Sequence, residues 1–133
     1  MERDGLLMSA LYVAGPMRGV PEFNFPLFRR ARCRLREVGY TVTCPAEMDE
    51  LDGFDPTGMT GYEPLDRLGL DLHTVLRRDV LAVLDADGIG TLPGFEDSRG
   101  ATAEVALGRA LGLRVAPVDR WITDAILAKR AVS

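Results

Sequence analysis

Short apolar runs alternate along the chain with longer segments in which apolar residues recur every three or four positions. The first run, residues 11–14, is continuously apolar and ends at Gly15 and Pro16, which is typical of a strand buried in a parallel sheet. Further strands are predicted at 40–44, 88–92 and 114–118. The spacing between these runs leaves room for a helix after each of them.

The segments between the runs carry helical patterns. A helix is predicted to begin near Asn24, which would cap it with Pro26 in the first turn, and to end at Gly39. A second covers about 68–84, a third runs from Ser98 to a stop at Gly112, and a closing helix covers 119–130. The first helix carries an apolar stripe of Phe28, Ala31, Leu35 and Val38. The helix at 68–84 is expected to turn Leu72, Leu76, Val80 and Val83 or Leu84 inward, and the closing helix has Trp121, Ile122, Ala125 and Ile126 on one face.

Strands and helices therefore alternate throughout, which predicts an α/β protein with a three-layer Rossmann-like or flavodoxin-like fold. We expect a parallel sheet of four to five strands with helices on both faces. Residues 49–66 are rich in Asp, Gly, Pro and Thr without a sustained period, so a long loop that orders over a ligand is expected there. At 133 residues the chain is expected to form one domain, 1–133, with its core at about 10–118.

Composition narrows the classes of partner. A net charge of −4 disfavours a nucleic-acid polymer, and the arginines of residues 29–36 are expected to be solvated. The sequence shows neither a signal peptide nor an apolar run of membrane-spanning length, so no membrane partner and a cytoplasmic location are expected. Cys33 and Cys44 have neither metal-ligand nor disulfide spacing, and neither a metal nor a cofactor is expected.

The segment Ser98-Arg-Gly-Ala-Thr-Ala-Glu104 combines a helix cap with an acid. Ser98 can cap the helix while backbone N–H groups near Arg99 and Gly100 accept a phosphate. Glu104 lies one turn beyond Gly100, at a rise of about 6 Å, comparable to the distance from a nucleotide's phosphorus to its anomeric carbon. The alternative is a solvated glutamate beside Gly108, a glycine that permits close helix packing.

Other residues are expected to join this segment at the carboxyl edge of the sheet. Arg18 follows the first strand, and together with Arg99 it could hold a dianion. Asp79 belongs to the helix before the third strand, which we expect to end near this edge, and could protonate or bind a leaving base. Tyr12, in the first strand, could orient a carboxylate. The alternative for Arg18 is an ordinary surface charge, and the alternative for Asp79 is a salt bridge. Tyr12 could equally be a buried aromatic residue without a function.

Several motifs together resemble those of the nucleoside 2-deoxyribosyltransferase-like superfamily. They are Tyr12-Val-Ala-Gly-Pro-Met-Arg-Gly19, the pair Arg78-Asp79, Asp87 before the third strand, and Ser98 to Glu104 followed by Gly108-Arg-Ala110. The resemblance covers about residues 10–118 and is sharpest to the 2′-deoxynucleoside 5′-phosphate N-hydrolases, with further likeness to small phage and bacterial members.

The resemblance implies a role for each matching residue. Glu104 would be the nucleophile, Tyr12 its orienting partner, and Asp79 would lie near the leaving base or sugar. The 5′-phosphate would be held by residues of the first turn and of the helix start: Gly15, Arg18, Gly19, Ser98, Arg99 and Gly100.

The expected function is hydrolysis of the N-glycosidic bond of a (2′-deoxy)nucleoside 5′-monophosphate, with the helix dipole lowering the pKa of Glu104. Transfer of the sugar to a second base remains open, as do a nucleotide-binding sensor without turnover and a structural protein on the same fold. A homodimer is also expected, for which the face with Trp121 and Ile126 is one candidate.

Overall fold

Four parallel strands form the centre of the molecule in the computed structural model, which describes residues 9–132 and the side chains of 9–131. The strands are β1 (Ala10–Ala14), β2 (Thr41–Thr43), β3 (Gly88–Thr91) and β4 (Arg114–Pro117), in the spatial order β2-β1-β3-β4. The structure does not describe residues 1–8 or residue 133. The prediction that the chain lacks a signal peptide falls on residues 1–8 and so lies outside the described residues.

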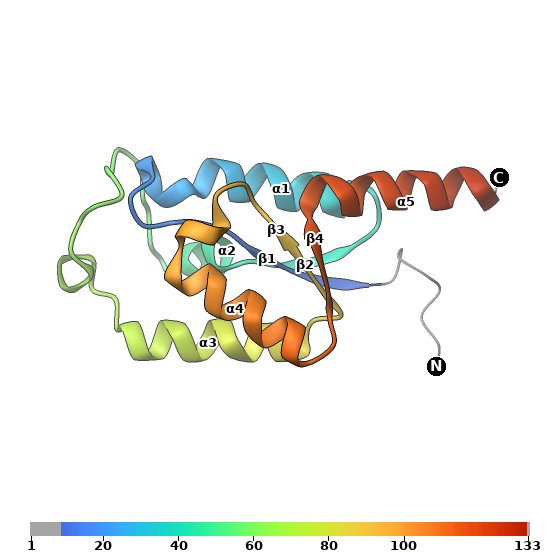
Figure 1. Cartoon of the computed structure of the whole chain (residues 1–133). Helices are drawn as coiled ribbons and strands as arrows, with labels where there is room; N and C mark the ends of the chain where they lie inside the picture. Colours follow the sequence, from blue (N-terminus) through green and yellow to red (C-terminus); the bar gives the residue numbers. More distant parts are fainter. Residues whose placement is uncertain (1–8, 133) are drawn as a thin grey trace.

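Helices cover both faces of this sheet (Figure 1). On one face lie α1 (Phe25–Glu37) and α5 (Val118–Val132), and on the other α3 (Leu72–Asp85) and α4 (Arg99–Ala110). The short helix α2 (Pro45–Leu51) follows β2, and single 3-10 turns lie at Pro21–Asn24, Leu65–Leu68 and Phe95–Asp97. The predicted α/β class, the all-parallel sheet and the three layers are confirmed.

The alternation of side chains along β1 assigns each residue to one of two cores. Leu11 and Val13 join the core under α1 and α5, whereas Tyr12 and Ala14 join the core under α3 and α4. Tyr12 is fully buried. The register of β1 therefore directs the Tyr12 side chain toward the helix that carries Glu104.

The closing helix belongs to the core of its own chain. Trp121, Ile122 and Ala125 are buried as predicted. The Trp121 indole donates to the Ile89 carbonyl at 2.9 Å, and a Cβ on Gly88 would come within 2.6 Å of its ring. The Trp121 side chain is therefore covered within its own chain, whereas Ile126, predicted on the same face, is 38% exposed, so a dimer contact at this face stays a prediction.

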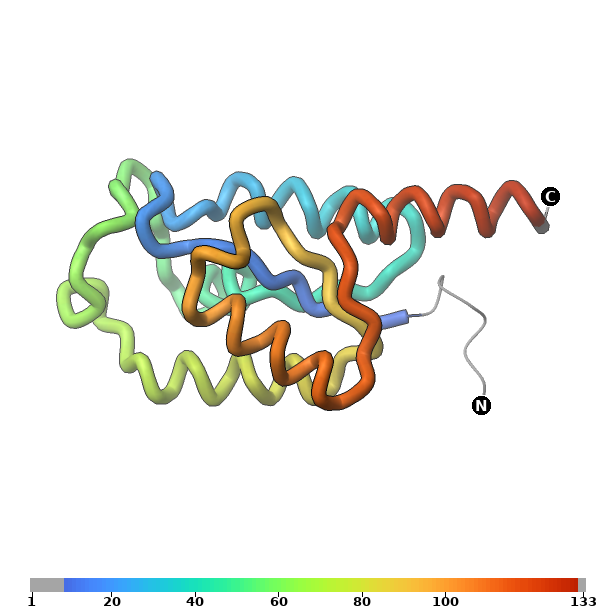
Figure 2. Tube along the Cα trace, viewed as in Figure 1, coloured from blue at the N-terminus to red at the C-terminus, as the bar shows by residue number. Residues whose placement is uncertain are grey.

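The chain between β2 and α3 differs most from expectation. Helix α2 extends to Leu51 and so includes the first residues of the expected 49–66 loop; its Pro45 is well tolerated in the first helical turn. In Figure 2 the chain after α2 projects beyond the carboxyl end of β1. It is fixed there by the bonds Gly19 N to Gly61 O and Glu22 N to Met59 O, both 2.8 Å. These contacts tie the segment to the turn after β1.

Helix α3 is also shorter and more exposed than predicted. It begins at Leu72 instead of near residue 68, and Leu72, Leu76 and Val80 are 52%, 43% and 39% exposed. Val83, by contrast, is fully buried. The expected inward stripe is wrong because α3 packs chiefly against α4, which covers only a narrow face of it.

The start of α1 departs from the predicted cap. Asn24 holds the cap position with a left-handed backbone (φ 65°), but its side chain makes no capping bond. Instead its Nδ2 donates to the Pro16 carbonyl at 2.8 Å. Asn24 thus ties the start of α1 to the turn after β1.

The helices are short compared with the thickness of a lipid bilayer. The longest, α5, has 15 residues, whereas a spanning helix needs about 20. Between residues 9 and 132, no helix has the length and apolar character needed to cross a membrane.

Candidate functional site

A pocket of about 210 Å³ lies where β1 ends and α4 begins. The connection from β1 leads outward to β2, and the chain then crosses back to β3, so this is a topological switch point, where ligands bind in open parallel sheets. Six of the predicted site residues line the pocket: Gly15, Arg18, Asp79, Ser98, Gly100 and Glu104.

Glu104 lines this pocket, and the fully buried Tyr12, which does not line it, holds Glu104 in place. The Tyr12 hydroxyl donates to Glu104 Oε2 at 2.7 Å, across 92 positions of sequence. Glu104 is only 8% exposed, and within residues 9–131 its Oε1 makes no hydrogen bond. One oxygen is thus held in place, and the other is left to act on whatever occupies the pocket.

Burial dominates the electrostatics of Glu104. It raises the pKa of this carboxyl to about 7, although the hydrogen bond from Tyr12 favours the ionised form and partly opposes the rise. The expectation that the helix start lowers this pKa is wrong. Glu104 is the sixth residue of α4, and the effect of the helix dipole fades within the first turn.

Asp79 is held by an arginine beside it. Arg78 donates through Nη2 and Nε to Asp79 Oδ1 at 2.8 and 3.0 Å, and its Nη1 lies 2.8 Å from Asp49 Oδ1. Burial raises the pKa of Asp79 to about 6 against the opposing effect of Arg78. Asp79 Oδ2 makes no hydrogen bond within the described residues, so one oxygen of this acid is also left for a ligand.

Asp49 is a pocket residue that sequence reasoning missed. It belongs to α2, is 6% exposed and lines the pocket beside Asp79. No motif marks it, and the segment was expected to be a loop. The only indication in the sequence is the excess of acids at 47–52, which does not say which of them turns inward.

The direction of α3 corrects the reason given for Asp79. A helix that leads into a parallel strand runs against the strands, so α3 begins at the carboxyl edge and ends beside the start of β1. There Asp87 N donates to the Ala10 carbonyl at 2.8 Å. Asp79 reaches the pocket from the middle of the helix and not from its end.

The opposite end of the pocket offers groups suited to an anion. Ser98 Oγ accepts from Ala101 N at 3.3 Å and so caps α4, while a Cβ on Gly100 would meet nothing within 4 Å. The Arg18 guanidinium donates to the carbonyls of Glu63 and Tyr62 at 2.7 and 3.1 Å. No carboxylate in the described part of the chain pairs with Arg18, so its charge stays available to a ligand.

Two of the predicted phosphate-binding residues lie outside the pocket lining. Gly19 adopts a φ of 85° and bonds Gly61, which shapes the turn that carries Arg18. Arg99 is exposed. Gly108, expected either to flank the acid or to permit packing, does the latter, because a Cβ there would lie 2.3 Å from Ile89 Cδ1.

An apolar wall completes the pocket. It consists of Leu65, Leu68, Leu70, Leu72, Val75 and Leu76, from the segment before α3 and from α3 itself. A wall of this kind suits the flat face of a ring. Among the described residues, no group of three or more His, Cys, Asp or Glu side chains could hold a metal ion.

Comparison with known proteins gives one family. The sequence model of a family described as a domain of unknown function (DUF4406) matches residues 9–117. The match extends from β1 to β4 and includes Tyr12, Arg18, Asp79 and Glu104. No curated protein matches the chain.

Proposed function

The chain belongs to the DUF4406 family, and we propose that it hydrolyses the N-glycosidic bond of a 2′-deoxynucleoside 5′-monophosphate. One observation carries the proposal: the buried Glu104, held by Tyr12 at 2.7 Å, shares a pocket with the start of its own helix and with Arg18. A nucleophile and an anion site one helical turn apart suit a sugar phosphate.

The orientation of the substrate follows from the pocket lining. The phosphate would lie at the backbone N–H groups of the α4 start, near Gly100, with Arg18 as its cationic partner. The sugar would then extend along α4 toward Glu104. The base would rest on the apolar wall of Leu65, Leu68 and Leu72.

The reaction has two steps. Ionised Glu104 attacks C1′, the bond from C1′ to the base nitrogen breaks, and its electron pair leaves with the base, which takes up a proton. Water then attacks C1′, the ester to Glu104 breaks and the carboxylate returns. The products are a free base and 2-deoxyribose 5-phosphate with retained configuration.

Asp79 is suited to the proton transfers. Its pKa of about 6 leaves a fraction protonated near neutral pH, able to donate to the departing base. Once ionised, Asp79 can accept a proton from the attacking water. Arg78 donates both of its hydrogen bonds to Oδ1 and so fixes the carboxyl group, and Oδ2 remains for these transfers.

The decisive experiment incubates the protein with each deoxynucleoside 5′-monophosphate and measures free base by chromatography. We expect release from at least one substrate and its loss in Glu104→Gln. Glu37→Gln, at the exposed end of α1, is the matched control and should keep full activity. Base release that survives Glu104→Gln unchanged contradicts the assigned nucleophile.

Two further measurements separate the related functions. A competing free base converted into a new nucleotide would indicate sugar transfer instead of hydrolysis. Stoichiometric binding in a calorimeter with no product over long incubation would indicate a nucleotide sensor. Removal of the 5′-phosphate from the substrate should abolish base release, because Arg18 and the α4 start would then have no ligand.

A further inference from the structure

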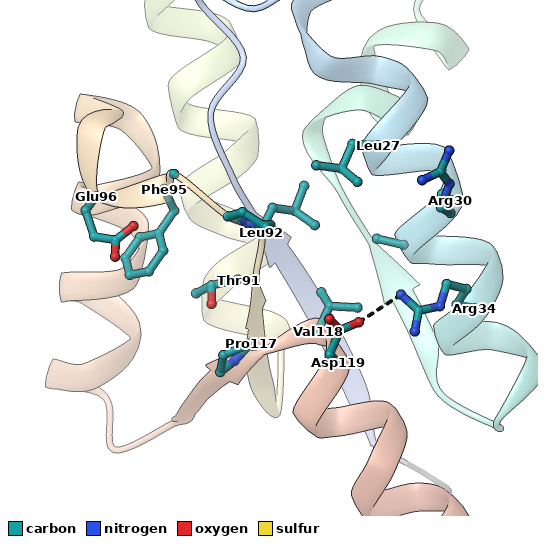
Figure 3. A pocket seen from close by; sticks show the side chains of 13 residues that line it. Leu27, Arg30, Arg34, Thr91, Leu92, Phe95, Glu96, Pro117, Val118 and Asp119 are labelled. Atoms are coloured by element: carbon teal, nitrogen blue, oxygen red, sulfur yellow. Dashed lines mark hydrogen bonds and ion pairs between the residues drawn. The ribbon is translucent and has the colours of Figure 1, made fainter.

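Two cavities lie along the carboxyl edge of the sheet, and they differ in how far their acids are buried. The larger, of about 320 Å³, crosses the ends of β3 and β4, and its two acids, Glu96 and Asp119, are exposed (Figure 3). The Glu104 pocket is instead lined by three buried acids: Asp49, Asp79 and Glu104. The proposed hydrolysis uses Asp79 and Glu104, so it leaves the buried Asp49 without a role.

Arg78 holds Asp49 and Asp79 side by side. Its Nη1 lies 2.8 Å from Asp49 Oδ1, while its Nη2 and Nε donate to Asp79 Oδ1. Each carboxyl group therefore presents one oxygen to the same guanidinium. Within the described residues neither Oδ2 makes a hydrogen bond, and neither is among the fully buried atoms that lack a partner. Both Oδ2 atoms thus stay accessible in a pocket that their residues line.

The three acids form a series in which Asp79 is the middle member. Arg78 contacts Asp79 and Asp49 directly, whereas the hydrogen bond to Glu104 comes from Tyr12. Burial is the main cause of the raised pKa of both Glu104 and Asp79, and the charge of a neighbouring acid adds to each rise: Asp79 for Glu104, and Asp49 for Asp79. With C1′ at Glu104 and the departing base at Asp79, Asp49 would lie beside the base.

The apolar wall decides which part of the base reaches these acids. Leu72, Leu76 and Asp79 are spaced by four and three positions on α3, so they line the pocket from one face of that helix. A ring whose flat face rests on the two leucines turns its edge, with the ring nitrogens and exocyclic groups, toward Asp79. Asp49 is then next to the group that neighbours the protonated nitrogen.

We propose that Asp49 selects bases that carry an amino group beside the nitrogen that Asp79 protonates. The proposal rests on the proposed hydrolysis and names its substrate class, the 5′-monophosphates of deoxyadenosine and deoxycytidine. Adenine and cytosine would direct an N–H donor at Asp49 Oδ2. Guanine, hypoxanthine, thymine and uracil have a carbonyl oxygen at that place, so two acceptors would face each other without a proton between them.

The ionisation of Asp49 agrees with an acceptor role. Burial raises the pKa of this carboxyl, but the Arg78 guanidinium at 2.8 Å opposes the rise and favours the ionised form. An ionised carboxylate accepts hydrogen bonds and donates none. Asp49 therefore complements Asp79, which donates a proton to the ring nitrogen.

The test compares substrates that differ only at this group, dAMP with dIMP and dCMP with dUMP. We expect the amino member of each pair to have a kcat/KM at least about tenfold higher. The same order should appear in their affinities for Glu104→Gln, measured by calorimetry, because Asp49 contacts the base before any bond breaks. Base release with equal kcat/KM within each pair overturns the role of Asp49 and keeps the hydrolysis. Preferential binding of the amino members without base release does the reverse.

Asp49→Asn and Asp52→Asn form a matched pair of variants. Both acids contact Arg78, at 2.8 and 3.3 Å, but Asp52 is exposed and does not line the pocket. The amide of Asp49→Asn can donate to a carbonyl oxygen, so this variant should lower the preference for dAMP over dIMP about tenfold, whereas Asp52→Asn should keep it. Because the preference is a ratio within one sample, partial unfolding of a variant does not alter it. An unchanged ratio in Asp49→Asn, or an equal loss in Asp52→Asn, contradicts the assignment.

Discussion

The environment of Glu104 and its proposed role favour different protonation states of its carboxyl group. Burial favours its protonated form, but a nucleophile must be ionised. The Tyr12 hydroxyl partly offsets the effect of burial, because a donor at 2.7 Å stabilises the ionised carboxylate without exposing it to water. Burial also raises the pKa of Tyr12 well above its ordinary value, so this hydroxyl keeps its proton and remains a donor.

Replacement of Glu104 by Gln should stabilise the fold in a pH-dependent way. The folded pKa of about 7 lies above the ordinary 4.5, so Glu104 contributes stability that is complete below pH 4.5 and is lost as pH rises through 7. The difference corresponds to about 3 kcal/mol. At pH 8 we expect Glu104→Gln to melt about 10 °C above the unchanged protein, and near pH 4.5 the two should coincide.

Thermal melting followed by circular dichroism between pH 4.5 and 8 measures this difference. Glu37→Gln, an exposed substitution, should melt with the unchanged protein at every pH. If the melting temperatures of Glu104→Gln and the unchanged protein differ by the same amount at every pH in this range, burial does not raise the pKa of this carboxyl.

Loss of the Tyr12 hydroxyl should alter activity through Glu104. In Tyr12→Phe the pKa of Glu104 rises further, because the ionised form loses its donor. The pH at which kcat/KM increases should therefore move upward, and activity at pH 7 should fall about tenfold. The control Tyr40→Phe removes a buried bond to the Trp121 carbonyl in the other core. A profile that moves equally in both variants contradicts the assigned role.

At the scale of elements, α4 shows what a sequence pattern can determine. Ser98, Gly100 and Glu104 belong to one helix, so their mutual geometry follows from its fixed pitch and was predictable. The two glycines of this helix were not distinguishable from sequence. A Cβ on Gly100 would enter open space, whereas one on Gly108 would meet Ile89 at 2.3 Å, and only packing across the sheet separates the two cases.

The two glycines form a matched pair for mutation. Gly108→Ala overpacks the core against Ile89 and should cost about 1–3 kcal/mol of unfolding free energy. Gly100→Ala should change stability by less than about 1 kcal/mol but raise KM for the monophosphate about tenfold, since its methyl group would occupy the anion site. Urea unfolding and steady-state kinetics on both variants measure these effects. An unchanged KM in Gly100→Ala would place the phosphate elsewhere.

Helices α2 and α3 show where the pattern fails. The short α2 is fixed by ion pairs that depend on the tertiary fold, such as Arg36 with Glu47 at 2.6 Å and Arg29 with Glu50 at 3.1 Å. The apolar stripe of α3 is real, but a stripe shows only that a surface is apolar and not which molecule covers it. Periodicity thus identified α3 and gave the wrong inward face.

At the scale of the whole molecule, the topology brings distant residues into one pocket. Asp79 comes from α3, Glu104 from α4 and Ser98 from its cap, while Tyr12 of β1 holds Glu104 from outside the pocket lining. The predicted parallel sheet was sufficient to place β1 and the start of α4 at one edge. Asp49 could not be anticipated, because its place depends on which side chains converge between elements and no motif records that convergence.

The exposed face of α3 leaves an apolar surface that a single chain does not cover. Five of the ten exposed large apolar residues in the described chain belong to this one helix: Leu72, Leu76, Val80, Leu81 and Leu84. Four of them are spaced by four positions and form one ridge, the arrangement by which helices pack against each other. Leu72 and Leu76 also line the Glu104 pocket, so whatever packs on the ridge lies beside the site.

We propose that the ridge forms a two-fold contact with a second copy of the chain, because a two-fold axis would cover the apolar ridge of each copy with that of the other. Light scattering at micromolar concentration should give twice the 14.5 kDa chain mass. Val80→Glu and Leu84→Glu, which do not line the pocket, should give monomers, since each would bury a carboxylate against leucines. Leu127→Glu, equally exposed on α5, should remain dimeric. A monomeric unchanged protein, or dimers that persist in both ridge variants, would show that this face is not the interface.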